Sequence, residues 1–203
     1  MAIKDRSRLD DHYSRQARRE GYPARSVYKL EEMDRKYRLF RPGQKVLDLG
    51  CAPGSWSLYA AGRVGEGGRV LGLDLKSPAG RRPSPPQLIF IQADILAAAP
   101  DMVRAWGPFD LVLSDLAPAT TGRREVDQAR SLELARAARD WAWALLKPGG
   151  HLVFKIFQSP EEAVFIRELQ NKFKEINLLK PKATRCSSQE IFGLGLFFRP
   201  GTS

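Results

Sequence analysis

Short apolar runs alternate with longer segments of mixed polarity along this chain. The runs cover residues 46–49, 69–74, 88–92, 109–115, 151–157, 176–181 and 191–198, and each predicts a β-strand. Patterns typical of helices cover residues 27–37, the stretch after Gly54, and residues 95–106, 126–146 and 161–173. Strands that alternate with helices in this way indicate an α/β domain with a largely parallel sheet.

The start of the chain has a different character. Residues 1–24 are polar and without a clear period, which predicts an irregular arm, and Ser26 is placed to cap the first helix. We expect residues 1–203 to form one domain, in which residues 1–45 are an arm and a helix and residues 46–198 are the core.

The most informative stretch runs from residue 45 to 57 and reads K-V-L-D-L-G-C-A-P-G-S-W-S. A strand containing Asp48 meets a turn with Gly50 and Gly54, and a helical pattern follows. Gly50 can adopt a positive φ and let a ligand approach the backbone. In an open α/β sheet a turn at this place is where ligands bind.

A second acid supports a nucleoside-type ligand. Asp74 ends the next strand, 20 residues beyond Gly54, where an acid can accept hydrogen bonds from two ribose hydroxyls. The loop lacks the G-x-G-x-x-G spacing of dinucleotide sites, and Pro53 removes one amide from any phosphate cradle. These residues suit S-adenosylmethionine better than NAD. The alternative is a turn whose glycines serve packing alone.

Further polar residues follow the other predicted strands. Asp94 and Asp115 end the third and fourth strands, so both should lie at the same sheet edge as Gly50 and Asp74. Asp94 could accept a hydrogen bond from an adenine amino group. Lys155 interrupts an apolar strand, where an unpaired lysine would be costly to bury.

Charge is concentrated at the two ends of the chain. Residues 1–45 hold 13 Lys and Arg against 7 Asp and Glu, residues 147–203 hold 9 against 5, and the middle is neutral. Tyrosines lie among the N-terminal charges, and bases can stack on such rings. This pattern favours an RNA partner over a membrane surface, and makes the Pro-, Gly- and Arg-rich loop at residues 77–87 a candidate RNA-facing segment. The alternative is that basic termini only keep the protein soluble.

Composition excludes several classes of protein. The longest apolar runs are far shorter than the ~18 residues of a membrane span, and the N-terminus lacks the apolar region of a secretory signal. Two cysteines, Cys51 and Cys186, neither form a disulfide framework nor match a C-x-x-C metal motif. We expect a cytoplasmic monomer without a metal.

Five segments together resemble one known family. They read A-R-S-V-Y-K-L, D-L-G-C-A-P-G-S-W-S, L-S-D-L-A-P, G-G-H-L-V-F-K-I-F and S-S-Q-E-I-F, within residues 12–198. The set resembles the FtsJ/RrmJ-type RNA 2′-O-ribose methyltransferases. The resemblance implies a Rossmann-like methyltransferase fold: a seven-stranded, mostly parallel sheet with its last strand antiparallel and helices on both faces.

The resemblance also assigns roles to residues. It implies a catalytic set of Lys29, Asp115, Lys155 and Glu190. For S-adenosylmethionine it implies contacts by Gly54, Trp56, Asp74, Asp94 and Asp115, beside Asp48 and Gly50 of the same loop. This chain departs from the bacterial rRNA enzymes at Ser55, where they usually have a second glycine, and at Gly193 and Gly195 in the last strand.

The reaction can be argued from its chemistry as well. A ribose 2′-hydroxyl is a poor nucleophile at neutral pH and needs a positioned base, for which Lys155 is the candidate. The expected activity is 2′-O-methylation of structured RNA, most readily large-subunit rRNA within a ribosomal subunit or its precursor. A tRNA substrate is the alternative within the class, and a non-catalytic RNA-binding or ribosome-assembly protein is the alternative outside it.

Overall fold

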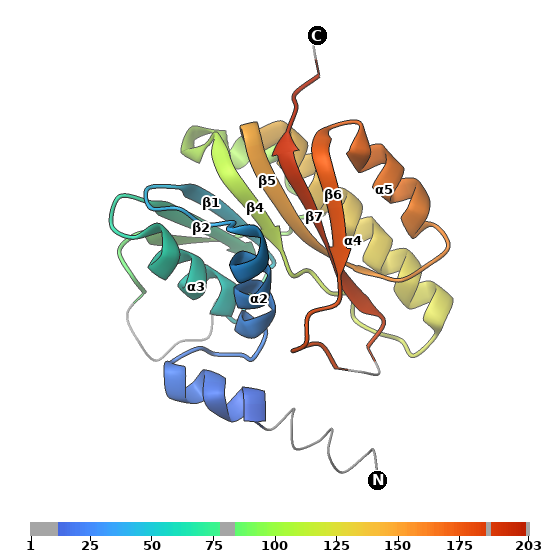
Figure 1. The fold of residues 1–203 in the computed structure, drawn as a ribbon, viewed down its shortest axis with the longest axis horizontal. Coiled ribbons are helices and arrows are strands. Elements are labelled where there is room, and N and C mark those ends of the chain that lie inside the picture. Colours follow the sequence, from blue (N-terminus) through green and yellow to red (C-terminus); the bar gives the residue numbers. More distant parts are fainter. Residues whose placement is uncertain (1–11, 78–83, 186–187, 202–203) are drawn as a thin grey trace.

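The computed structural model describes residues 12–77, 84–185 and 188–201. It has three layers, in which one sheet lies between two layers of helices (Figure 1). Cys186 and most of the loop expected at residues 77–87 lie outside the described residues. Among the described helices, none is both long enough and apolar enough to cross a membrane.

The sheet has seven strands in the order β3-β2-β1-β4-β5-β7-β6. β7 pairs antiparallel with both β5 and β6, and the other neighbours are parallel. The predicted sheet is therefore confirmed. The strands are β1 (Lys45–Leu49), β2 (Arg69–Asp74), β3 (Leu88–Gln92), β4 (Phe109–Ser114), β5 (Leu146–Phe157), β6 (Phe173–Leu179) and β7 (Glu190–Phe198).

The helices bury one apolar core on each face of the sheet. α2 (Val27–Tyr37) and α3 (Ser55–Val64) pack on one face, over residues such as Val46 and Phe192. α4 (Arg124–Leu145) and α5 (Glu162–Gln170) pack on the other, over residues such as Leu47 and Phe154. Alternate residues of the strands thus serve opposite cores, which is why these strands are apolar throughout.

Two predicted elements differ from the structure in kind. Residues 12–20 form a helix rather than an irregular arm, because Ala17 is buried beside Val27 and the Tyr13 ring packs on Tyr28. The helix predicted over residues 95–106 is only the 3₁₀ helix η1 (Pro100–Trp106). η1 begins at Pro100, because proline is favoured at the first position of a helix, where its missing N–H costs no hydrogen bond.

The two glycines of β7 have a packing explanation. A Cβ on Gly193 would overlap the ring of Phe154, and one on Gly195 would lie 2.8 Å from the ring of Phe173. Both rings lie on the α4–α5 face of the sheet and fill the space that a side chain would take. These glycines therefore belong to the core and leave the site unchanged.

Candidate active site

The topology brings the predicted site residues to one edge of the sheet. β1, β2, β3 and β4 end at this edge, followed by Gly50, Asp94 and Asp115. β7 begins there because it is antiparallel, and its first residue, Glu190, pairs with Phe157 at the end of β5. α2 contributes Lys29 from above the same edge.

The loop after β1 is shaped by its glycines. Gly50 has φ 75° and Gly54, directly before α3, has φ 110°. A Cβ on Gly50 would lie 2.6 Å from Leu116 Cδ2 in the loop after β4, so the close approach of the two loops requires glycine. The first-turn amides of α3 have no partner within the helix and can face a ligand.

Asp74 joins this loop to the loop after β2. Its carboxylate accepts hydrogen bonds from the amide of Ala52 at 2.9 Å and from the amide of Lys76 at 2.8 Å. Asp94 accepts one from the amide of Leu96 at 2.9 Å and is exposed. Each carboxylate has lone pairs beyond these bonds, so each can still accept from a ligand.

Asp48 is fully buried beneath the loop. Ser57 Oγ donates to its Oδ2 at 2.5 Å, while its Oδ1 has no partner. Burial raises the pKa of Asp48 to about 7, the negative charges of Asp115 and Asp74 add to the rise, and the Ser57 hydrogen bond opposes it. In this position Asp48 supports the loop from below, and a direct contact between Asp48 and the cofactor stays a prediction.

Lys155 and Asp115 form a pair between neighbouring strands. Lys155 Nζ donates to the backbone oxygen of Asp115 at 2.7 Å and to its Oδ1 at 2.9 Å. Lys155 is 6% exposed. The predicted problem of a lysine in an apolar strand is thus solved by two hydrogen bonds at the sheet edge.

A second lysine pairs with an acid that is distant in the sequence. Lys29 Nζ donates to Glu190 Oε1, and it lies 5.5 Å from the ring centroid of Phe192. Phe192 is also the residue opposite Lys155 in the β5–β7 ladder. Side chains two residues apart in a strand lie on the same face, so Glu190 and Phe192 both face α2, as does Lys155 opposite Phe192. Both lysine–acid pairs therefore lie on one side of the sheet.

Trp56 has a role that the sequence did not reveal. Its side chain is 3% exposed, packs 5.7 Å from Phe192 between ring centroids, and donates from Nε1 to the carbonyl of Ser26 at 2.9 Å. The indole therefore joins α3 to the start of α2, and only the Trp56 backbone remains for a ligand. Ser26 precedes α2, but its side chain makes no capping hydrogen bond.

Ser55 makes a second connection that sequence reasoning missed. Its hydroxyl accepts from the amide of Ala24 at 2.7 Å and donates to the carbonyl of the same residue at 3.1 Å. The segment that carries Lys29 is thus bound to the first turn of α3 at two points. The departure from glycine at this position was the signal that could have pointed to it.

Comparisons with known proteins agree with this geometry. The family described as FtsJ-like methyltransferase matches residues 22–198. A protein of Sorangium cellulosum named ribosomal RNA large subunit methyltransferase E is 51% identical over 187 residues, which are 92% of this chain and 87% of that protein. A protein of Desulfatibacillum aliphaticivorans with the same name is 47% identical, over 91% of this chain and 89% of its own length.

Solved structures show the same fold. A Plasmodium falciparum protein described as a ribosomal RNA methyltransferase superposes with a TM-score of 0.78 at 26% identity, over 89% of this chain and all of that one. The family match covers the whole sheet and all five segments that suggested the resemblance. This chain is therefore a member of the FtsJ-like methyltransferase family.

Proposed function

We propose that this protein transfers a methyl group from S-adenosylmethionine to a ribose 2′-hydroxyl of large-subunit rRNA. The observation that carries the proposal is the Lys155–Asp115 pair, which lies at the same sheet edge as the glycine loop. The relatives named ribosomal RNA large subunit methyltransferase E support the substrate. Action as a cytoplasmic monomer, on a ribosomal subunit or its precursor, stays a prediction from the sequence.

The donor set suits S-adenosylmethionine. Asp74 can accept from the ribose hydroxyls and Asp94 from the adenine amino group. The negative charge of Asp115 would hold the sulfonium, and Gly54 leaves the backbone of the loop accessible. Three carboxylates at one edge would repel a pyrophosphate, which argues against a dinucleotide.

Lys155 is suited to act on the 2′-hydroxyl. In its neutral form the amine has two N–H groups and one lone pair, and Asp115 accepts from two positions. The lone pair is then left for the hydroxyl proton, and Asp115 fixes its direction. When bound, S-adenosylmethionine supplies a methyl group already activated by its sulfonium, so only the nucleophile needs activation by the protein.

Lys29 and Glu190 would hold the ribose. Their ion pair offers both a donor and an acceptor to sugar hydroxyls, beside the ring of Phe192. Positioning of this kind can supply much of the rate, because the reacting atoms must lie roughly 3–3.5 Å apart. We therefore assign Lys155 as base, Asp115 as its orienting partner, and Lys29 with Glu190 as ribose-positioning residues.

The test uses S-adenosylmethionine with a labelled methyl group. Purified protein is offered large ribosomal subunits, their free rRNA, and total tRNA, all from cells that lack the gene. We expect one labelled ribose in large-subunit rRNA. Label in tRNA alone would show that tRNA, and not rRNA, is the substrate. No label in any of the three samples would favour the alternative of a non-catalytic RNA-binding protein.

A further inference from the structure

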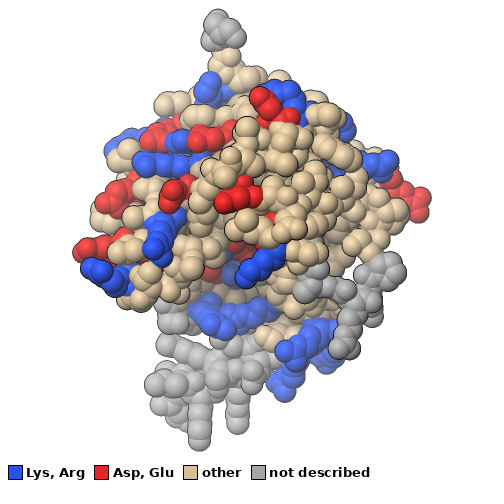
Figure 2. Space-filling view, turned by 180° about the vertical axis from the view of Figure 1, so that it is seen from behind, with Lys and Arg blue, Asp and Glu red and all other residues tan. Residues whose placement is uncertain are grey.

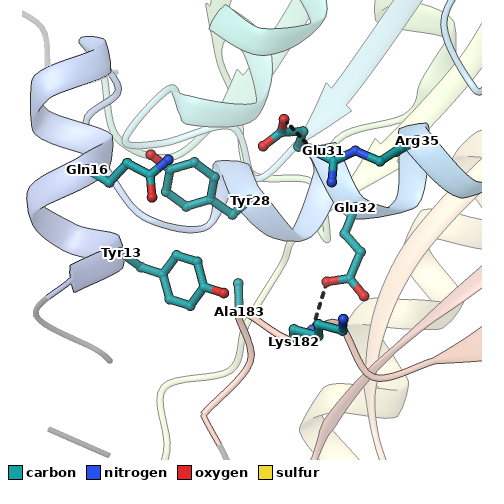
Figure 3. A pocket seen from close by; sticks show the side chains of 8 residues that line it. All are labelled: Tyr13, Gln16, Tyr28, Glu31, Glu32, Arg35, Lys182 and Ala183. Atoms are coloured by element: carbon teal, nitrogen blue, oxygen red, sulfur yellow. Dashed lines mark hydrogen bonds and ion pairs between the residues drawn. The ribbon is translucent and has the colours of Figure 1, made fainter. Parts of the chain in front are cut away.

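A cavity of about 270 Å³ lies between the helix of residues 12–20 and α2 (Figure 3). The helix of residues 12–20, α2 and the segment after β6 line it, and it is open to solvent. Tyr28, next to Lys29 in α2, lines one wall, and Lys182, eight residues before Glu190, lines another. Both lining residues are thus near the ion pair in the sequence, so an RNA strand bound at that pair can extend to this cavity.

One side of the cavity is aromatic. The rings of Tyr13 and Tyr28 lie with centroids 5.4 Å apart and planes tilted by 40°. The Tyr28 hydroxyl donates to Glu20 Oε2 at 2.9 Å, which fixes that ring, whereas Tyr13 is only partly buried. A partly exposed ring beside a fixed one offers a face for stacking.

The opposite side carries carboxylates. Glu32 Oε2 accepts from the backbone amide of Lys182 at 2.8 Å, which leaves its other oxygen for a ligand, as Figure 3 shows. Glu31 Oε1 accepts from Arg35 at 3.0 Å. A carboxylate only accepts hydrogen bonds, so the free oxygen of Glu32 can accept one from a ligand, beside the basic Arg35 and Lys182 of the same lining.

The surroundings of the cavity are basic. Arg18 and Arg19 are exposed on the helix of residues 12–20. Figure 2 shows Lys and Arg gathered at the end of the molecule where this helix lies, whereas both signs of charge mix over the rest of the visible face. Exposed arginines on a helix that also lines a cavity with acceptors suit a base attached to a phosphate backbone.

We propose that this cavity binds a nucleobase of the RNA next to the nucleotide that is methylated. Tyr13 stacks on the base, and Glu32 accepts a hydrogen bond from its amino group. The base is adenine, guanine or cytosine, because uracil has no amino group. The proposal rests on the function proposed above, since it assumes an RNA substrate.

The experiment measures single-turnover methyl transfer against the concentration of large ribosomal subunits from cells that lack the gene. Tyr13→Ala should raise the half-saturating concentration about tenfold, as for the loss of one base–aromatic stack, with little change in the rate at saturation. Glu32→Gln should raise it several-fold. The glutamine oxygen can still accept from the Lys182 amide, so Glu32→Gln keeps the cavity wall intact. This variant therefore tests the cavity even if Tyr13→Ala loosens the helix of residues 12–20.

Two control variants remove the same groups elsewhere. Trp106→Ala deletes a partly exposed ring on η1, and Glu133→Gln removes an exposed negative charge on α4. Both should match the wild type. If the wild type transfers methyl groups and the two cavity variants saturate like it, the cavity proposal is wrong and the proposed function stands. If the wild type transfers none to rRNA, both are wrong.

Discussion

The two halves of the sheet edge treat their acids differently. At the ends of β2 and β3, Asp74 and Asp94 accept hydrogen bonds from backbone amides. At the ends of β4 and the start of β7, Asp115 and Glu190 each accept from a lysine. Among the described residues, the carboxylates of Asp74 and Asp94 thus have no basic partner and can accept hydrogen bonds from a ligand. The carboxylates of the second half are paired with lysine amines.

This difference suggests a division of labour. The hydroxyls and amino group of a cofactor suit the acidic half, and a hydroxyl that must lose a proton suits the half with lysines, where Asp115 also faces the sulfonium. Asp48 lies beneath both halves: burial is the main cause of its raised pKa, and the charges of Asp115 and Asp74 add to the rise.

Lys155→Ala should abolish most of the chemistry and leave cofactor binding intact. Removal of a general base typically lowers the rate by ~10²–10⁴-fold, and alanine fits the apolar strand. Single-turnover transfer of a labelled methyl group measures the loss. Lys147→Ala is the matched control, since Lys147 is in the same strand but pairs with Asp110 at the opposite edge. A comparable rate in Lys155→Ala, with an unchanged melting curve, would exclude Lys155 as the base.

Lys29→Met should destabilise the fold, because Glu190, whose side chain is only 14% exposed, would keep its charge without its partner. Losses of about 3–5 kcal/mol are typical of such half-broken pairs. The double variant Lys29→Met/Glu190→Gln should regain most of the unfolding free energy that Lys29→Met loses, since no unpaired charge remains. It should still transfer methyl groups poorly. Urea unfolding and transfer rates measured on the same samples check both parts. A double variant as active as the wild type would remove this pair from the site.

Asp48→Asn should change how stability depends on pH. The pKa of Asp48 is raised to about 7 in the folded chain, so between about pH 4 and 7 unfolding releases its proton and the wild type loses stability as pH rises. Asparagine does not titrate and can still accept from Ser57. Relative to the wild type, the variant should gain roughly 2 to 4 kcal/mol of unfolding free energy between pH 4 and 8. Urea unfolding at several pH values gives the free energy of unfolding of both proteins. If the two free energies change with pH in parallel, Asp48 does not titrate as a buried acid.

Asp74→Ala should weaken S-adenosylmethionine binding by about 1–3 kcal/mol, because ribose hydroxyls lose a charged acceptor. Asp74→Asn should weaken it less, since an amide oxygen can still accept from Ala52 and keep the loop in place. Calorimetry on both variants provides the ranking. Equal affinity in wild type and Asp74→Ala would place the cofactor elsewhere.

The double variant Arg18→Gln/Arg19→Gln should flatten the salt dependence of RNA binding, by about 0.9 in the log–log slope for each phosphate that the protein no longer neutralises. Both arginines are exposed, so the helix of residues 12–20 should stay folded. Arg136→Gln/Arg167→Gln, on α4 and α5, makes the same charge change on the opposite face. If the two double variants have the same slope, the basic helix only keeps the protein soluble.

The sequence predicted the sheet well because its strands are short, apolar and separated by clear turns. Lys155 could be singled out because an amine is anomalous in a buried strand. The partner of Lys29 had no such signal: Glu190 lies 161 residues away and was assigned only through the family resemblance.

Other features depend on tertiary contacts that no local pattern encodes. The helix of residues 12–20 is polar along most of its length and is held by Ala17 and Tyr13 against α2. Trp56 was expected at the cofactor, but its indole is directed to Ser26. The hydroxyl of Ser55 has a partner only because the chain returns to it at Ala24.

The most direct test compares Lys155→Ala and Asp74→Ala in two measurements on the same samples, calorimetric affinity for S-adenosylmethionine and single-turnover methyl transfer at saturating cofactor. Division of labour between the halves predicts a crossed result. Lys155→Ala should bind the cofactor like the wild type and transfer at least about 100-fold more slowly, whereas Asp74→Ala should bind weakly and transfer at nearly the wild-type rate once saturated. Two variants that lose affinity and rate in equal proportion would contradict it.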